Sequence, residues 1–336
     1  LSGDLTRGLA RMEQPIMGRM QSWDNAWDLF AMSKFSTITS LGESPVQDGI
    51  LYVGTDDGLI QVTQDGGENW KKIEVGSIQG IPANAFVNDI RADLFDAQTV
   101  YAALDNHKEG DYKPYIIKST DAGNSWKLIS GNIDNRTLVW RLVQDHVRKD
   151  LLFAATEFGI YFTVDGGKEW IRMKGGMPTI PFRDIQIQRR ENDLVGASFG
   201  RGFYILDDLS PLRELTPEMV KEDAKVFPVK DTWLYSPRGV TVAPGASEYR
   251  AENPPFGATF TYYLKEDIKS LKQLRKDQEK KLNASDSDIP FPGWEALEAE
   301  LNEDAPTLLF AVKDEKGKLV NHVKAPARKG IHRVSW

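Results

Sequence analysis

Short apolar runs of strand length recur at equivalent positions along the first two thirds of the chain. Four runs form one unit, and the unit is repeated. The predicted strands are residues 36–40, 51–55, 59–63 and one from 71; then 87–92, 100–104, 115–119 and one from 127; then 139–144, 152–156, 160–163 and one from 171; and then 182–188 in a fourth unit. Four short strands in a repeat of roughly 40 to 50 residues are typical of β-propeller blades.

One polar sequence separates the third strand from the fourth in three of the units. It starts with Ser or Thr, continues as Asp-x-Gly, and ends in a Trp five residues after the Asp, at residues 63–70, 119–126 and 163–170. Gly accepts positive φ, and the Asp carboxylate can accept N–H bonds from its own loop. The Trp has a large face to bury. The sequence therefore predicts that each of these eight-residue stretches, which we call a box, forms a tight turn followed by a buried Trp.

The pattern changes after residue 215. Residues 206–211 replace the box in the fourth unit, and residues 216–223 form a linker. Strand-length runs then alternate with Pro, Gly and Asp, which predicts a small β-sandwich. Its predicted strands are residues 224–229, 232–235, 258–264, 307–313, 319–323 and 331–336. Within residues 265–304 the apolar period becomes about 3.6, which predicts a helical hairpin whose second helix covers 294–301.

The predicted fold is therefore all-β. Residues 35–215 form four blades of a partial propeller, and residues 224–336 form a β-sandwich-like domain with the helical insertion. Residues 1–34 are predicted to be the tail of a preceding blade and a connecting segment, with a short helix near 26–32, because residues 1–5 match 129–133, which follow a box. We expect the sequence to be truncated at both ends, since its last residues stop in the middle of a strand pattern.

The boxes are similar to the Asp boxes of bacterial-neuraminidase (BNR) repeats, which occur in sialidases, xyloglucanases and sortilin-type receptors. Residues 52–58 and 199–208 resemble bacterial sortilin-like (VPS10-type) proteins, which are often labelled glycosyl hydrolases. This resemblance implies an exported bacterial protein. It also implies that the box is structural and lies at the outer turn, away from any active cleft. The structural residues are then Asp65, Trp70, Asp121, Trp126, Asp165 and Trp170.

Composition excludes several classes of function. The net charge of −7 argues against a nucleic-acid partner, which would require a basic surface. No run of eighteen apolar residues exists, so no membrane span is predicted. The absence of cysteine excludes disulfides and thiol catalysis. The four histidines have no metal-type spacing, and neither a metal nor a cofactor is expected.

Candidate binding residues follow the second strand of successive units, and we therefore expect them to lie on one rim. The second unit is enlarged at residues 105–114, and such loops often carry function on a rigid scaffold. The predicted rim residues are Asp56, Asp57, Asp105, Asn106, His107, Glu157, Phe158 and Arg201. Acids with one Arg can bind a sugar, a peptide amine or Ca²⁺, and they can equally be ordinary loop surface.

Catalysis is the weaker prediction. Glycoside hydrolysis requires two carboxylates about 5 to 9 Å apart, or a Tyr nucleophile as in sialidases. The Phe-Arg-Ile-Pro element of sialidases is absent, and residues 181–184 are only superficially like it. The leading prediction is a non-catalytic propeller module that binds peptide or glycan through the rim. The alternatives are a fragment of a polysaccharide-degrading glycoside hydrolase and an assembly scaffold.

Overall fold

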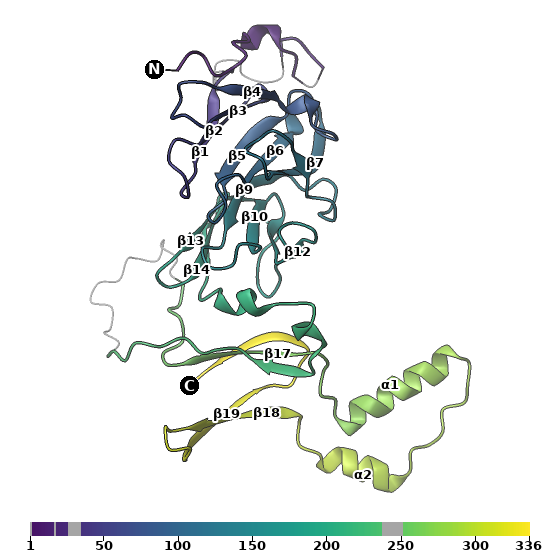
Figure 1. Ribbon diagram of the computed structural model, residues 1–336. Helices are drawn as coiled ribbons and strands as arrows, with labels where there is room; N and C mark the ends of the chain where they lie inside the picture. The colour runs from purple at the N-terminus through teal and green to yellow at the C-terminus, as the bar shows by residue number, and fades with distance from the viewer. Residues whose placement is uncertain (1, 17, 26–34, 237–250) are drawn as a thin grey trace, which may run out of the picture. The chain divides into compact units, whose positions relative to one another are not determined.

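The chain divides into two units, Leu1–Arg213 and Glu214–Trp336. The structure is a computed structural model, and it describes residues 2–16, 18–25, 35–236 and 251–336. The short helix expected near residues 26–32 lies outside the described residues. The first unit contains the repeated sheets, and the second contains two smaller sheets and two helices (Figure 1).

Four antiparallel sheets follow one another along the first unit, and in each the strands are ordered as in the sequence. Blade 1 contains β1 (Ile38–Glu43), β2 (Leu51–Thr55), β3 (Leu59–Thr63) and β4 (Lys71–Glu74); blade 2 contains β5 (Phe86–Ala92), β6 (Val100–Asn106), β7 (Asp111–Ser119) and β8 (Lys127–Leu128). Blade 3 contains β9 (Val139–Gln144), β10 (Leu152–Thr156), β11 (Gly159–Thr163) and β12 (Ile171–Arg172); blade 4 contains β13 (Phe182–Gln188), β14 (Asp193–Ser198) and β15 (Gly202–Leu206).

Neighbouring blades pack face to face through apolar side chains. Tyr52 and Val62 of blade 1 lie in one buried cluster with Ile117 of blade 2. Tyr101 of blade 2 lies in another with Leu152 of blade 3. The first strands are also neighbours, since β1 contacts β5, β5 contacts β9 and β9 contacts β13. The prediction of propeller-like blades is confirmed.

One glycine shows how closely the blades approach. A Cβ on Gly54 would lie 2.4 Å from Val87 Cγ1 of blade 2 and 2.4 Å from Ser40 Oγ. Heavy atoms cannot approach to that distance, so only glycine permits this packing. The sequence pattern gave no reason to single out this residue.

The three Asp boxes fold alike. In the first, Thr63 Oγ1 donates to Asp65 Oδ1 at 2.7 Å, and the backbone N–H of Asn69 donates to the same oxygen at 2.9 Å. Ser119 with Asp121 and Thr163 with Asp165 repeat the arrangement. Two of the Trp side chains reach the interior: Trp126 packs against the core between blades 1 and 2, and Trp170 lies in the core between blades 2 and 3. Trp70 is half-buried, and its indole N–H donates to the Gly67 carbonyl at 3.1 Å.

Two features of the first unit differ from the prediction. Blade 4 has three strands among the described residues, whereas the repeat predicts four. The enlargement at residues 105–114 is an extension of the β6–β7 hairpin, in which Asn106 pairs with Asp111 around a 3-10 turn, η3 (His107–Glu109). The polar composition of this segment concealed its strand pairing.

Residues before blade 1 cover part of its surface. Leu5 is buried, and its carbonyl accepts a hydrogen bond from Gln61 Nε2 at 2.7 Å. The equivalent residue in the internal repeat is Ile133, which lies in the core beside Trp170. The assignment of residues 1–34 to the tail of a preceding blade stays a prediction.

The second unit has two small sheets. One contains β16 (Ala224–Val226), β17 (Thr259–Leu264) and β20 (Gly330–Ser335), and the other contains β18 (Thr307–Lys313) and β19 (Leu319–Pro326). Tyr262 and Ala325 meet in the core between them. The strand predicted at residues 232–235 is wrong, since this segment forms neither a strand nor a β-bridge, and Leu234 is exposed.

The predicted helical hairpin is present as α1 (Leu271–Ala284) and α2 (Trp294–Asn302), which lie outside the two sheets of their unit (Figure 1). Ser270 and Gln273 form a capping box at the start of α1. Arg275 joins the helices by two hydrogen bonds to Glu300. No helix among the described residues has the length and apolar character needed to cross a membrane. Short 3-10 turns occur at Arg11–Glu13, Val75–Ser77, Ser210–Glu214 and Met219–Lys221.

Candidate functional site

The edge of the first unit where the second strands end, which we call the rim, carries all the predicted binding residues. The first strands of blades 2, 3 and 4 also begin there. In chain order the predicted residues are Asp56 and Asp57 after β2, Asp105 and Asn106 at the end of β6, His107 in η3, Glu157 and Phe158 after β10, and Arg201 after β14.

Each first strand contains a β-bulge close to the rim. The register skips one residue in β1, β5, β9 and β13, and the bulged residues are Thr39, Asn88, Trp140 and Arg183. A bulge turns its side chain out of the normal alternation of the strand. The same device therefore directs one side chain per blade at the same level of the propeller.

In blades 1 and 2 the bulged residue binds the next blade. Thr39 Oγ1 donates to the carbonyl of Val87 at 2.7 Å, and Asn88 Nδ2 donates to the carbonyl of Val139 at 2.8 Å. Each accepting carbonyl belongs to the residue just before the next bulge. These hydrogen bonds link blade 1 to blade 2 and blade 2 to blade 3.

Blades 3 and 4 use an aromatic ring and a cation instead. The guanidinium carbon of Arg183 lies 3.7 Å from the centre of the Trp140 ring and 5.6 Å from the Phe199 ring. Trp140 is buried, whereas Arg183 is exposed and Phe199 is 68% exposed. Among the described residues no carboxylate forms an ion pair with Arg183. The guanidinium of this exposed arginine is thus held beside an aromatic surface.

Two further residues contact Trp140. Its indole N–H donates to Glu157 Oε2 at 3.0 Å, and the His107 ring lies edge-on at 6.0 Å. Glu157 therefore serves as an acceptor for the indole. The neighbouring Phe158 is exposed.

Most of the predicted acids contact other groups of the protein itself. Asp56 and Asp57 are buried: Asp56 accepts the backbone N–H of Thr37 at 2.8 Å, and Asp57 accepts that of Arg7 at 2.7 Å. Asp105 is also buried. Its carboxylate contacts Nδ1 of His107. These contacts give the acids structural roles, and their contact with a ligand stays a prediction.

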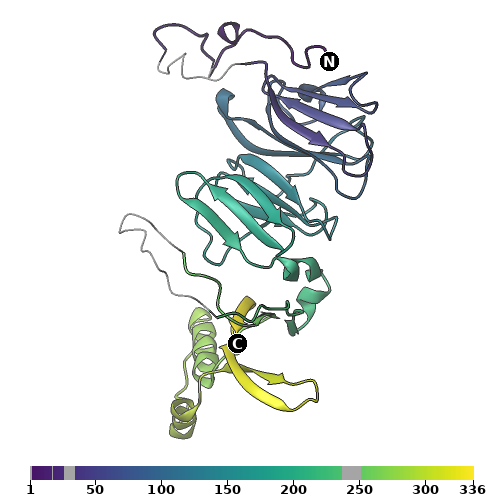
Figure 2. The ribbon, with the colours of Figure 1, turned by 90° about the vertical axis from the view of Figure 1, so that its left-hand side faces the viewer.

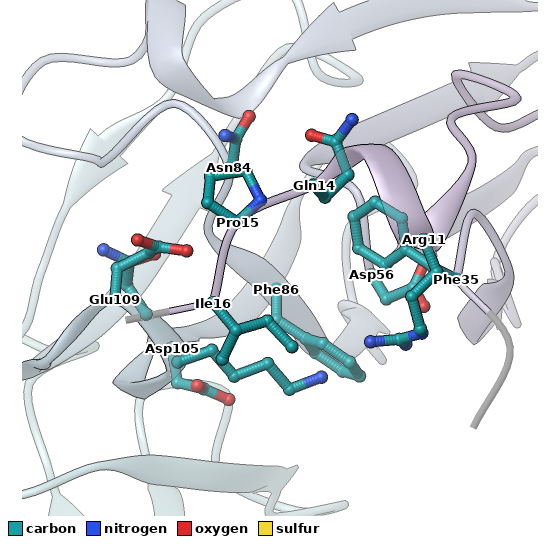
Figure 3. A pocket seen from close by; sticks show the side chains of 12 residues that line it. Arg11, Gln14, Pro15, Ile16, Phe35, Asp56, Asn84, Phe86, Asp105 and Glu109 are labelled. Atoms are coloured by element: carbon teal, nitrogen blue, oxygen red, sulfur yellow. The ribbon is translucent and has the colours of Figure 1, made fainter. Parts of the chain in front are cut away.

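A small pocket opens at the rim, lined by blades 1 and 2 and by residues 11–16 of the segment before blade 1 (Figure 3). Its cavity volume is about 120 Å³, and its lining includes three predicted residues, Asp56, Asp105 and Asn106. The ring of Phe86 forms part of the wall, and Lys108 Nζ lies 5.4 Å from its centre.

Lys108 lines this pocket and has a displaced pKa. Burial lowers the pKa of Lys108 below its usual value because it disfavours the charged form, and the nearby charge of Arg11 acts in the same direction. Asp56 and Asp105 oppose the shift. A half-buried cation with a displaced pKa in a cleft is a candidate functional group.

The structure brings only part of the predicted set together. Asp105 lines the pocket, and its contact with His107 connects the pocket to the Trp140 cluster. Phe158 and Arg201 lie on the rim outside the pocket. Among the described residues, no group of three or more His, Asp or Glu side chains is arranged to hold a metal ion.

The sequence interpretation missed the rim's main cationic and aromatic groups. They are Arg11, Lys108, Trp140, Arg183 and Phe199. A β-bulge has no reliable sequence signature, so the special direction of Trp140 and Arg183 was invisible. Phe199 was detectable, because it follows β14 just as Asp56 follows β2.

Comparison with known proteins concerns the fold. No protein-family model matches the chain, and no curated protein sequence is similar to it. Among solved structures, YCF48 bound to D1 peptide matches with a TM-score of 0.39 at 17% identity over 52% of this chain and 52% of that protein. The Niastella koreensis GH74 enzyme matches with a TM-score of 0.42 at 15% identity, over 52% of this chain and 29% of that one. The Xanthomonas campestris GH74 xyloglucanase matches with a TM-score of 0.40 at 14% identity, over 51% of this chain and 29% of that one. The chain thus spans about half or less of the length of these proteins.

Proposed function

We propose that the first unit is a non-catalytic binding module whose rim recognises an acidic peptide segment. The observation that carries the proposal is the exposed Arg183 guanidinium, which lies over Trp140 beside the exposed ring of Phe199. Arg presents planar paired donors that suit carboxylates, and stacking on an aromatic ring holds them in place.

Lys108 of the rim offers a further basic group to the same class of ligand, whereas the rim acids Asp56, Asp57 and Glu157 already accept hydrogen bonds within the fold. His107 touches the Trp140 ring, and Lys108 next to it lies in the pocket. The chain as a whole carries a net charge of −7, so its overall field does not attract an acidic segment. Attraction of an acidic segment would therefore arise at the rim and not from the overall field.

Hydrolysis of glycosides is less well supported. A glycosidase needs one carboxyl able to donate a proton and a second able to attack or to activate water. Asp56, Asp57 and Glu157 instead accept hydrogen bonds from groups of the fold itself. Neutral glycan also offers no carboxylate to Arg183.

A binding measurement tests the proposal. Fluorescein-labelled hexaglutamate is titrated with the protein at low salt, with hexaserine as the neutral probe, and anisotropy is recorded. Arg183→Gln should weaken hexaglutamate binding about tenfold or more, since a charged hydrogen bond contributes about 1.5 to 3 kcal/mol. Arg190→Gln is the matched control, because Arg190 is an exposed arginine of the same blade that pairs with Glu191 after β13.

Three outcomes would contradict the proposal. They are no binding of hexaglutamate, equal loss in both arginine variants, or equal affinity for hexaserine. Incubation with xyloglucan tests the alternative: release of reducing sugar that disappears in Asp57→Asn or Asp105→Asn would favour a glycoside hydrolase.

A further inference from the structure

The last strand of blade 4 has an open edge. In blades 1, 2 and 3 the third strand pairs with a fourth, as β3 with β4, β7 with β8 and β11 with β12. Among the described residues, β15 pairs only with β14. Its other side therefore presents unpaired backbone N–H and C=O groups. Blade 4 is the last sheet in the row of blades, coloured green in Figure 2.

This open edge is unusually apolar. The sequence of β15 is Gly-Phe-Tyr-Ile-Leu, with no charge and no proline, and Phe203 is 75% and Ile205 59% exposed. Natural sheets protect free edges with charged residues, proline or short length. The outer strands of blades 1 to 3 follow that rule, since β4 and β8 contain lysines and β12 has two residues.

The register of the repeat shows which positions are exposed. Gly54, Ala103, Ala155 and Ala197 are equivalent in the second strands, and they pair with Ile60, Ile116, Ile160 and Phe203. The three isoleucines are at most 2% exposed. Phe203 is thus the exposed member of this set, because within the described residues of the first unit neither a fourth strand nor a further blade follows β15.

The existing fourth strands define the chemistry of a segment that would fit. Ile73 pairs with Ile60, and the backbone N–H groups of Ile129 and Met173 donate to the carbonyls of Ile116 and Ile160 at 2.8 and 2.9 Å. The residue opposite this position is therefore apolar in all three blades. The two residues before it are mostly basic: Lys71 and Lys72, Lys127 and Leu128, Ile171 and Arg172.

We infer that β15 binds an extended segment of a partner protein, which adds to blade 4 as an antiparallel fourth strand. The segment carries a basic stretch followed by an apolar residue that packs against Phe203, and its N–H at that residue donates to the Phe203 carbonyl. Addition of a strand to a sheet edge draws affinity from main-chain hydrogen bonds and specificity from alternate side chains. This site is separate from the acidic-peptide site on the rim and does not depend on it.

A synthetic peptide with the sequence of residues 169–174, Glu-Trp-Ile-Arg-Met-Lys, is the probe. We expect it to bind the protein and to slow hydrogen exchange of the amides in β15. N-methylation of its Met should weaken binding about tenfold, because that N–H is the one that donates to the sheet. N-methylation of its Arg should leave affinity nearly unchanged, since that N–H points away from β15.

Substitutions in the protein test the same inference from the other binding partner. Phe203→Lys with Ile205→Lys should abolish binding without unfolding the chain, because both side chains are already exposed. Leu41→Lys is the matched control, an exposed apolar residue of β1 that is 67% exposed. The inference is overturned by absence of binding, by equal effects of the two N-methyl groups, or by equal effects of the substitutions. It is also overturned if sedimentation shows that a second copy of the chain occupies the edge.

Discussion

At the scale of single residues, the Asp-box carboxylates act as acceptors within their own turns. Asp65 receives the backbone N–H of Asn69, which lowers the pKa of this carboxyl to about 2 together with the bonds from the Thr63 and Asn69 side chains. Asp121 has a pKa of about 2 because it receives the Ser125 hydroxyl and N–H. The same turn chemistry therefore recurs with different partner residues.

These displaced pKa values predict how stability depends on pH. The folded pKa lies below that of the unfolded chain, so the stabilisation is complete above about pH 4 and is lost as the pH falls toward 2. Asp65→Asn should lower the free energy of unfolding at pH 7, and its difference from the parent should shrink between pH 4 and 2. Urea denaturation at several pH values measures this, and a difference independent of pH would contradict it.

At the scale of elements, successive blades are joined by specific polar contacts as well as by apolar packing. The bulged residues of β1 and β5 each bind the following blade. Near the end of the first unit, Arg213 donates to both oxygens of the buried Asp145 at 2.8 and 2.9 Å, and to Asn192 of blade 4 at 2.8 Å. This arginine therefore ties the chain after blade 4 to blade 3.

Removal of Arg213 should be strongly destabilising. Arg213→Met leaves the Asp145 carboxylate buried without its cation, which typically costs about 3 to 5 kcal/mol. The matched control is Arg190→Met, which breaks an exposed pair with Glu191 and should cost about 0 to 1 kcal/mol. Chemical denaturation of both variants checks the contrast. If both variants lost a similar free energy of unfolding, Arg213 would not be important for holding the chain after blade 4 to blade 3.

At the scale of the whole molecule, each unit has its own core. The first has clusters between its blades, and the second is centred on Tyr262, whose hydroxyl donates to the Pro326 carbonyl at 2.6 Å. The second core is much smaller, and neither α1 nor α2 has a fully buried residue. Small cores give low stability.

We therefore expect the two units to unfold in separate transitions, with the second unit first. Tyr262→Ala should lower the free energy of unfolding of the second unit by about 3 to 5 kcal/mol, as for other large aromatic residues in cores, and leave the first transition in place. Scanning calorimetry with hydrogen exchange of each unit measures this. A parallel shift of both transitions would contradict independent cores.

The predicted strands were accurate where local chemistry decides them. β2, β3, β9, β10, β13 and β18 have the predicted bounds, and the Asp-x-Gly turns fold through contacts within eight residues. The expected strand at residues 232–235 failed because apolar content alone does not supply a pairing partner. The open edge of β15 was also not predicted, because apolar content does not show whether a strand has a partner on each side.

The binding site was harder to predict than the blades. Asp56 and Glu157 directly follow a second strand and Asp105 lies at the end of one, which is the position along the repeat on which the prediction of a common rim rests. In the structure these acids contact other residues of the fold. Arg183 and Phe199 are instead the exposed residues that a ligand could contact. Burial depends on residues far away in the chain, such as Thr37 and Trp140, and spacing does not reveal it.

By itself, then, the sequence determined the repeated unit, its strands and its turns, because these arise from alternation and from glycine and aspartate chemistry within a few residues. Tertiary structure alone decided which side chains face solvent, where the bulges direct Trp140 and Arg183, and which strand edge is left open. The physical reason is that exposure, stacking and edge pairing are relations between blades, and only the packed blades define them.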